Sequence, residues 1–124
     1  MDVAFTPREL DVMAVLWDRE SATVADVQDA LHDELAYTTV LTVLRTLEEK
    51  GFVRHSADGR AHRYHPLVAR ERAGSSALRR VLGKVFGGSP ELLLTQLVDD
   101  ERITEADLRR MRALLDERLA GEDP

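Results

Sequence analysis

The chain of 124 residues is long enough for one domain or two small modules, and its 44% hydrophobic and 32% charged residues are typical of a folded, helix-rich protein. It contains no cysteine, which excludes disulfides, a thiol nucleophile and a cysteine-ligated metal site. The first residues lack the basic and apolar segments of a signal peptide, and no run reaches the ~20 apolar residues of a membrane span. We therefore expect a cytoplasmic protein without membrane insertion.

The formal net charge of −6 is unfavourable for a nucleic-acid ligand when it is averaged over the chain, but its distribution is uneven. Residues 37–66 contain five Lys and Arg against three Asp and Glu, a local balance of +2. His55, His62 and His65 add to this charge when they are protonated. The positive charge is confined to one stretch, which is compatible with DNA binding but is weak evidence for it.

Two short helices are predicted in the N-terminal part of the chain. Thr6 and Glu9 form a capping box with proline at the first helical position, and we expect this helix to end near Arg19. The residues at helical spacing, which we interpret as its core face, are Leu10, Met13, Leu16 and Trp17. Thr23 and Asp26 give a weaker capping signature for a second helix of about three turns. Its expected buried residues are Val24, Val27, Leu31 and Leu35.

The third predicted helix, residues 38–50, has an unusual outer face. Its apolar stripe consists of Val40, Val43, Leu44 and Leu47. Gly51 is the expected stop. The outer face of an ordinary solvated helix is mostly Glu, Lys and Gln, whereas this one carries four threonines and an arginine. Short hydroxyls, methyl groups and a guanidinium suit the major groove of DNA. We interpret this segment as a recognition helix whose candidate DNA contacts are Thr38, Thr39, Thr42, Arg45, Thr46 and Lys50.

Two positions on this helix have more than one interpretation. Thr38 is also placed to cap the helix, and the two roles can coexist. Leu41 lies near the outward face, where it could contact a thymine methyl or pack against the segment that follows. The sequence leaves both roles of Leu41 open.

Residues 52–65 predict a β-hairpin. Two short strand-like segments, 52–55 and 61–65, flank the pair Asp58-Gly59, a strong turn signal because glycine tolerates positive φ. A hairpin directly after a recognition helix is the wing of a winged helix, and we expect Tyr64 to anchor it in the core. The basic residues of the wing, which could reach backbone phosphates or the minor groove, are Arg54, Arg60 and Arg63.

The sequence gives little support for a metal site or an enzyme. Strand alternation places His62 and His65 on opposite faces, whereas metal ligands must converge. No nucleophile–base pair, phosphate-binding glycine loop or carboxylate dyad stands out. We therefore expect no cofactor, no metal and no enzymatic activity.

The C-terminal half predicts three more helices. The first covers residues 68–86, the second begins at Ser89-Pro90-Glu91, and the third is capped by Thr104-Glu105-Ala106-Asp107. These helices carry more leucine than they can easily bury within one chain, which favours a homodimer over packing against their own winged helix. The candidate dimerisation residues are Leu78, Val81, Leu82, Val85, Leu93, Leu97, Leu108, Met111 and Leu115.

The expected fold is therefore mainly α with a small β-hairpin wing, an N-terminal winged helix-turn-helix followed by a C-terminal helical dimerisation region. In this layout the chain resembles the BlaI/MecI family of penicillinase and methicillin-resistance repressors. The residues that carry the resemblance are Glu9-Leu10 with Met13, Leu16 and Trp17; Tyr37-Thr38-Thr39-Val40 with Thr42; Leu47-Glu48-Glu49-Lys50-Gly51; and Gly59-Arg60 with Tyr64 and Pro66. They cover the first half in order and spacing, whereas the second half matches mainly in layout.

The resemblance implies a homodimeric transcriptional repressor that binds palindromic operator DNA. Residues 1–66 would bind DNA through recognition helix 38–50 and wing 52–65, and residues 67–124 would dimerise. Family repressors are often inactivated when a membrane sensor-protease responds to a β-lactam and the dimerisation region is cut. That implies a sensor-protease as a further partner.

Two departures bear on the inducing signal. The family's cleaved bond lies between asparagine and phenylalanine, and the corresponding bond here is Gln96-Leu97, so that motif is not kept. The related copper-responsive repressors carry a C-terminal cysteine cluster, which this chain lacks. The operator, the regulated genes and the inducer are not readable from the sequence.

Two alternatives remain beside the DNA-binding homodimer. A winged helix can serve as a protein-interaction module without DNA contacts, but an apolar or acidic outer helix face and a wing without arginines would then be expected. A repressor that responds to a small ligand is the second alternative, and no residue identifies such a ligand.

Overall fold

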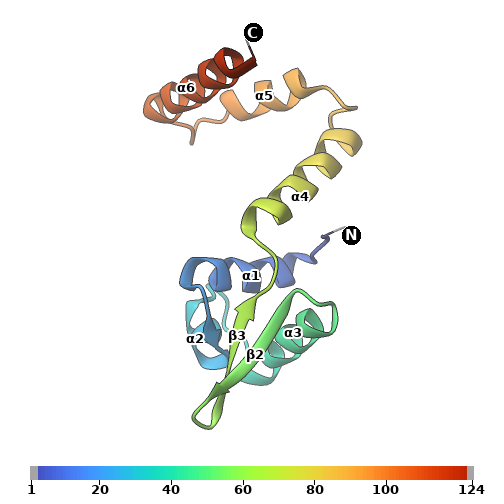
Figure 1. Ribbon diagram of the computed structural model, residues 1–124, viewed down its shortest axis with the longest axis vertical. Helices are drawn as coiled ribbons and strands as arrows, with labels where there is room; N and C mark the ends of the chain where they lie inside the picture. The colour runs from blue at the N-terminus through green and yellow to red at the C-terminus, as the bar shows by residue number, and fades with distance from the viewer. Residues whose placement is uncertain (1–2, 123–124) are drawn as a thin grey trace. The chain divides into compact units, whose positions relative to one another are not determined.

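The computed structural model describes residues 3–122 and divides the chain into two compact units, Met1–Leu78 and Arg79–Pro124. The first unit contains six complete elements in the order helix, strand, helix, helix and two hairpin strands (Figure 1). These elements are α1 (Pro7–Arg19), β1 (Ala22–Thr23), α2 (Val24–Ala30), α3 (Tyr37–Glu49), and the hairpin of β2 (Val53–Asp58) and β3 (Ala61–Pro66). The helix α4 (Arg70–Lys84) begins in the first unit and ends in the second.

The three strands form one antiparallel sheet in the order β1-β3-β2. β2 and β3 pair along their whole length, from Val53 opposite Pro66 to Asp58 opposite Ala61. β1 adds Ala22 opposite Tyr64 on the other side of β3. Three helices with such a sheet form a winged helix, so the predicted fold class is confirmed.

The core of the first unit lies between the three helices and the sheet. Its fully buried side chains come from every helix and both hairpin strands: Val12, Met13, Leu16, Val27, Val40, Leu44, Leu47, Val53 and Tyr64. Burial raises the pKa of the Tyr64 phenol. Trp17 is half-buried beside this core, and its Nε1 donates to the carbonyl of Val68 at 2.8 Å. Core packing is therefore confirmed for Trp17 and Tyr64.

Local capping explains where α1 and α2 begin. The Thr6 hydroxyl accepts from the Glu9 amide, and the Glu9 carboxylate accepts from the Thr6 amide at 2.9 Å. Thr23 and Asp26 repeat this reciprocal pair at α2. Hydrogen bonds from the Thr23 backbone and side chain lower the pKa of Asp26. Both predicted capping boxes are confirmed.

Several predictions for the first unit were wrong in detail. Leu10 is 47% exposed, because the buried stripe of α1 is centred on Val12, Met13 and Leu16 and Leu10 lies beside it. The helix α2 has two turns, since Leu31 adopts an extended conformation and ends it. Thr38 does not cap α3, whose N-cap residue is Ala36.

The hairpin also differs from the sequence prediction. Its strands are longer than predicted, because Asp58 still pairs with Ala61 in the sheet. The turn therefore consists of Gly59 and Arg60, with Gly59 at a φ of 61°. The short strand β1 was not predicted at all.

The second unit contains the end of α4 together with α5 (Pro90–Val98) and α6 (Glu105–Glu122). Gly87 and Gly88 both adopt positive φ after α4, and the Ser89 hydroxyl caps α5 by accepting from the Leu92 amide. Thr104 and Asp107 exchange hydrogen bonds at the start of α6, as the sequence predicted. Neither α5 nor α6 buries a single residue.

None of the helices within residues 3–122 combines the length and apolar character that a membrane crossing requires.

Candidate nucleic-acid interface

The outer face of α3 presents short side chains on a rigid helix. Thr38, Thr39, Thr42 and Arg45 are exposed, and Thr46 is half-buried. The face is available because Val40, Leu44 and Leu47, on the opposite side, hold the helix in the core. The structure therefore places all five sequence-predicted residues of this helix face at the surface of the first unit.

Two of these threonines are bonded back to their own helix. The Thr42 hydroxyl donates to the Thr38 carbonyl at 2.9 Å, and the Thr46 hydroxyl donates to the Thr42 carbonyl at 3.0 Å. With its proton used in this way, each hydroxyl retains acceptor capacity for an external group. The amino groups of adenine and cytosine are the donors that the major groove offers.

The five basic residues of the helix and hairpin fall into two classes. Lys50 and Arg63 are paired internally. The Lys50 ammonium lies 2.7 Å from the Glu9 carboxylate, and the Arg63 guanidinium lies 2.9 Å from Asp58 and also contacts the Ser21 hydroxyl. Within residues 3–122, no acidic group lies within ion-pair distance of the other three, which are Arg45, Arg54 and Arg60.

The Lys50 pair is a structural link between the end of α3 and the start of α1. The Glu9 side chain is only 6% exposed. Burial by itself raises the pKa of this carboxyl, but the hydrogen bonds from Lys50 and from the Thr6 amide outweigh that effect and lower the pKa. The charge of Lys50 is accordingly already paired inside the protein.

An open hollow of about 160 Å³ lies between α3 and the hairpin turn. Tyr37, Leu41 and Arg45 follow one another at i, i+4, i+8 along α3 and line one side. Arg60 and His62 line the other side. Tyr37 and His62 were not among the DNA-binding residues predicted from the sequence, because only the fold brings the hairpin turn against this stripe. Leu41, whose role the sequence left open, lines the hollow and also packs against the core.

The histidines of the hairpin form a pair rather than a metal cluster. The rings of His55 and His62 stack with centroids 4.5 Å apart, and His55 Nδ1 lies 2.6 Å from a Glu48 carboxylate oxygen. His65 lies on the other face, within 2.8 Å of the Ser56 hydroxyl. Burial, together with the charges of Arg54 and Arg63, lowers the pKa of His65. No group of three metal-ligating side chains occurs among the residues that the structure describes.

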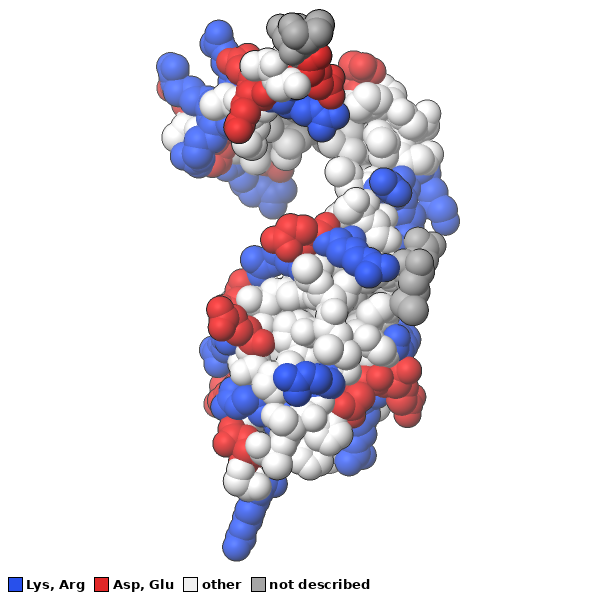
Figure 2. Space-filling view, in the orientation of Figure 1, with Lys and Arg blue, Asp and Glu red and all other residues white. Residues whose placement is uncertain are grey.

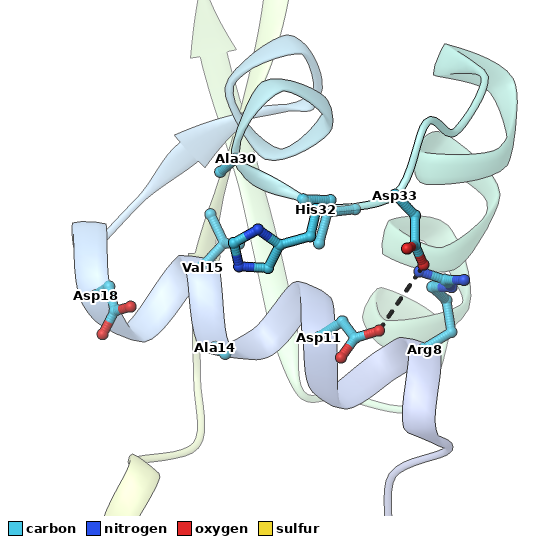
Figure 3. Close-up of a pocket in the computed structure, with 9 residues that line it drawn as sticks. Arg8, Asp11, Ala14, Val15, Asp18, Ala30, His32 and Asp33 are labelled. Atoms are coloured by element: carbon cyan, nitrogen blue, oxygen red, sulfur yellow. Dashed lines mark hydrogen bonds and ion pairs between the residues drawn. The ribbon is translucent and has the colours of Figure 1, made fainter.

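The tip of the hairpin projects from the first unit (Figure 1), and basic side chains extend around it (Figure 2). A different surface lies over α1 and the end of α2, where a pocket of about 420 Å³ is lined by several aspartates (Figure 3). Its one arginine, Arg8, is held by Asp33 at 2.9 Å and by Asp11 at 3.4 Å. This acidic surface would repel phosphate, whereas the surface of α3 and the hairpin would attract it.

The candidate dimerisation residues are all at least partly exposed in the single chain. Val85 is 69% exposed on α4, Leu97 is 40% exposed on α5, and Leu115 is 52% exposed on α6. Others are half-buried: Leu82, Leu93 and Met111. Only one residue of α5, Glu91, carries a charge, so the helix presents a largely uncharged surface (Figure 2).

Comparison with known proteins identifies relatives over most of the chain. Residues 5–117 match the family model described as penicillinase repressor. A transcriptional regulator BlaI from Mycobacterium tuberculosis is 40% identical over 113 residues, which cover 87% of this chain and 82% of that protein. The methicillin resistance regulatory protein MecI of Mammaliicoccus sciuri is 20% identical over 112 residues, which cover 89% and 91% of the two chains.

Among solved structures, a MarR family protein from Bacillus stearothermophilus has a similar fold. It matches with a TM-score of 0.52 at 21% identity, covering 94% of this chain and 77% of that chain. At this level of identity the match supports the winged-helix fold and carries no argument about ligands.

Proposed function

The chain belongs to the penicillinase repressor family, and from this membership we propose that it is a transcriptional repressor that binds palindromic operator DNA as a homodimer. In this proposal residues 1–66 bind DNA and residues 67–124 dimerise. The observation that supports the DNA-binding part is the position of Arg45 on α3 and of Arg60 at the hairpin turn, which line the same hollow and have no acidic partner among residues 3–122. Arg54 is likewise unpaired in this range but lies on the hairpin face that carries His65.

The recognition helix α3 would enter the major groove and the hairpin would lie along the backbone. Thr38, Thr39 and Thr42 occupy the first half of α3, the part that usually reaches base edges. Arg45 and Thr46 follow within the next turn. Arg54 and Arg60 would contact phosphates, while Lys50 and Arg63, which are already paired, would contribute less.

Dimerisation is supported by the lack of a core in the second unit. Its helices α5 and α6 bury no residue, although they carry leucine at helical spacing. Apolar surface removed from water contributes roughly 25 cal/mol per Å², so a second copy that covers these leucines would be stabilised by many such contacts. Two copies would also present two recognition helices about one DNA turn apart, the spacing that a palindrome requires.

Relief of repression by a membrane sensor-protease is the regulatory part of the proposal. The bond Gln96-Leu97 lies in the last turn of α5, and both residues are exposed. Cutting there would separate α6 from the rest of the proposed dimerisation region. The absence of the family's asparagine–phenylalanine pair means that a protease for this chain would have to recognise a different sequence.

The test is a salt titration of binding to a palindromic duplex from the region upstream of the chain's own gene, with a scrambled duplex as the control. We expect preference for the palindrome, two chains per duplex and an affinity that falls steeply with salt. Equal and weak binding to both duplexes would contradict specific recognition of that site. Loss of all binding even at low salt would leave the protein-interaction module as the better interpretation.

A further inference from the structure

The two strands of the hairpin are held unevenly by the rest of the first unit. β3 lies in the middle of the sheet between β1 and β2, and its Arg63 also contacts the Ser21 hydroxyl. β2 is an edge strand that pairs with β3 alone. Its first residue, Val53, is buried in the core, whereas four of the five residues that follow are exposed. The core therefore anchors β2 only at its beginning.

A side-chain hydrogen bond joins the exposed part of β2 to α3. His55 Nδ1 lies 2.6 and 2.8 Å from the two carboxylate oxygens of Glu48, and the imidazole donates because an ionised carboxylate can only accept. Glu48 is 32% exposed and His55 is 39% exposed. Among residues 3–122, no other hydrogen bond or ion pair joins a side chain of α3 to the hairpin. The polar connection between this helix and β2 thus depends on one pair of side chains.

The hairpin face that carries His55 extends this contact toward the turn. The His55 ring stacks on the His62 ring of β3, with centroids 4.5 Å apart and planes 18° apart. His62 is two residues from Arg60, and both line the hollow beside α3. Glu48 follows Arg45 by three residues, so it lies on the side of the helix that lines the same hollow. Loss of the Glu48 contact would therefore free the part of the hairpin that carries Arg60.

A carboxylate at this position opposes DNA binding by its charge. It would repel phosphates beside the proposed DNA surface, so on charge alone Glu48 should weaken binding. The next residue, Glu49, is also acidic and is exposed, and it has no hydrogen bond or ion pair from its side chain within residues 3–122. The two acids have the same charge and neighbouring positions, but only Glu48 contacts the hairpin.

We propose that Glu48 is a positioning residue for the hairpin: its bond to His55 holds the outer half of the hairpin against α3, so that Arg60 is presented to a phosphate of the bound DNA. Glu48 itself would not touch the DNA. This inference rests on the proposed function, and it predicts that removal of an acidic side chain weakens binding to a polyanion. Charge alone predicts the opposite sign, so the sign of the effect distinguishes the two.

The first experiment compares three variants in titrations with the labelled upstream duplex at fixed salt and pH. Glu48→Ala removes the acceptor and should bind severalfold more weakly than the wild type. Glu48→Gln keeps an oxygen that accepts from His55, so it should bind at least as tightly as the wild type. Glu49→Ala is the matched control for the loss of charge and should not weaken binding. Urea unfolding of the three variants checks that each is folded.

The second experiment asks whether Glu48 acts through Arg60. In the wild-type background, Arg60→Ala should lower the slope of log affinity against log salt by about one per subunit. In the Glu48→Ala background, where the turn is no longer held, the same substitution should change the slope little. In the Glu49→Ala background it should keep its full effect.

A third measurement tests the position of the hairpin without DNA. NMR relaxation of the backbone amides reports motion on the picosecond-to-nanosecond timescale. The order parameters of residues 54–62 should fall in Glu48→Ala, because the outer half of the hairpin is released. They should stay at the wild-type values in Glu48→Gln and in Glu49→Ala.

The outcomes separate this inference from the proposed function. Wild-type or tighter binding by Glu48→Ala, or an equal loss of affinity in Glu48→Gln or Glu49→Ala, would overturn the positioning role. An undiminished effect of Arg60→Ala in the Glu48→Ala background, or unchanged order parameters in Glu48→Ala, would do the same. If the wild type binds neither the upstream nor the scrambled duplex at low salt, the proposed function itself fails, and the relaxation measurement still decides whether Glu48 holds the hairpin.

Discussion

The two units of the chain use their leucine and valine residues in opposite ways. In the first unit Val12, Leu16, Val40, Leu44 and Leu47 are fully buried, so that the fold is complete within one copy. In the second unit α5 and α6 bury nothing, and their leucines remain at the surface. Under the proposed dimerisation, the first half of the chain would be stable alone, whereas the second half would depend on a second copy to cover its apolar side chains. Four measurements test this contrast.

The largest effect is expected for the core of the first unit. Leu44→Ala removes a fully buried side chain and should lower the free energy of unfolding by about 2–5 kcal/mol at any protein concentration. The measurement is urea unfolding followed by the fluorescence of Trp17, the one tryptophan of the chain. Leu92→Ala, at an exposed position of α5, is the control and should leave this transition nearly unchanged. A comparable loss in both variants would refute the idea that the first core is complete in one copy.

The next effect concerns self-association. Leu115→Glu places a carboxylate on the exposed stripe of α6 and should weaken dimerisation by at least about tenfold, or roughly 1.4 kcal/mol. Sedimentation equilibrium measures the change. Leu10→Glu provides a matched control, because Leu10 is a similarly exposed leucine in the first unit and should not affect dimerisation. Equal dimerisation of the wild type and Leu115→Glu would mean that this stripe stays open to solvent.

A smaller effect separates the two classes of basic residue within the first unit. Arg60→Ala should weaken DNA binding without changing stability, since Arg60 is exposed and has no acidic partner among the described residues. Arg63→Ala should show the opposite pattern. It should change DNA affinity little and cause a small loss of stability, because it breaks the contacts to Asp58 and Ser21. Thermal unfolding and DNA titration of both variants measure the difference. The same effect of both variants on DNA affinity would show that internal pairing does not matter for binding.

The smallest effect is acid destabilisation through Glu9. Because its pKa is lowered in the folded protein, ionised Glu9 contributes stability above its ordinary pKa, and that contribution is lost as the pH falls through the folded pKa. Lys50 is partly exposed, so we expect about 1 kcal/mol or less. Glu9→Gln should remove this part of the pH dependence of stability. The measurement is unfolding followed by Trp17 fluorescence between about pH 3 and 6. An unchanged acid profile in Glu9→Gln would exclude the Lys50 pair as its source.

The sequence predicted the features that depend on neighbouring residues. The capping pairs at Thr6, Thr23 and Thr104, the extent of α3 and the stop at Gly51 all follow from local hydrogen bonding and backbone conformation. The prediction of the apolar stripe of α3 was correct, because the spacing of its residues is set by the period of the helix itself. These are short-range rules, and they apply equally in both units.

The sequence failed where distant segments decide the structure. Leu31 ends α2 although its spacing continues the helical pattern, and Leu10 faces solvent because the other helices cover a neighbouring stripe of α1. The two-residue strand β1 exists only through its pairing with Tyr64 and Arg63 of β3. For the same reason the side chains around the hollow, Tyr37 and His62, could not be grouped before the hairpin was placed against α3.

The exposed threonines of α3 have a consequence for evolution. Thr38, Thr39 and Thr42 contribute nothing to the core, and the helix is held by Val40, Leu44 and Leu47 on its other side. Substitutions at these three positions are therefore nearly neutral for folding. If these threonines read bases as proposed, a descendant of a duplicated gene would be able to change its base preference at these positions without loss of the scaffold. Binding specificity could then diverge while the core is kept.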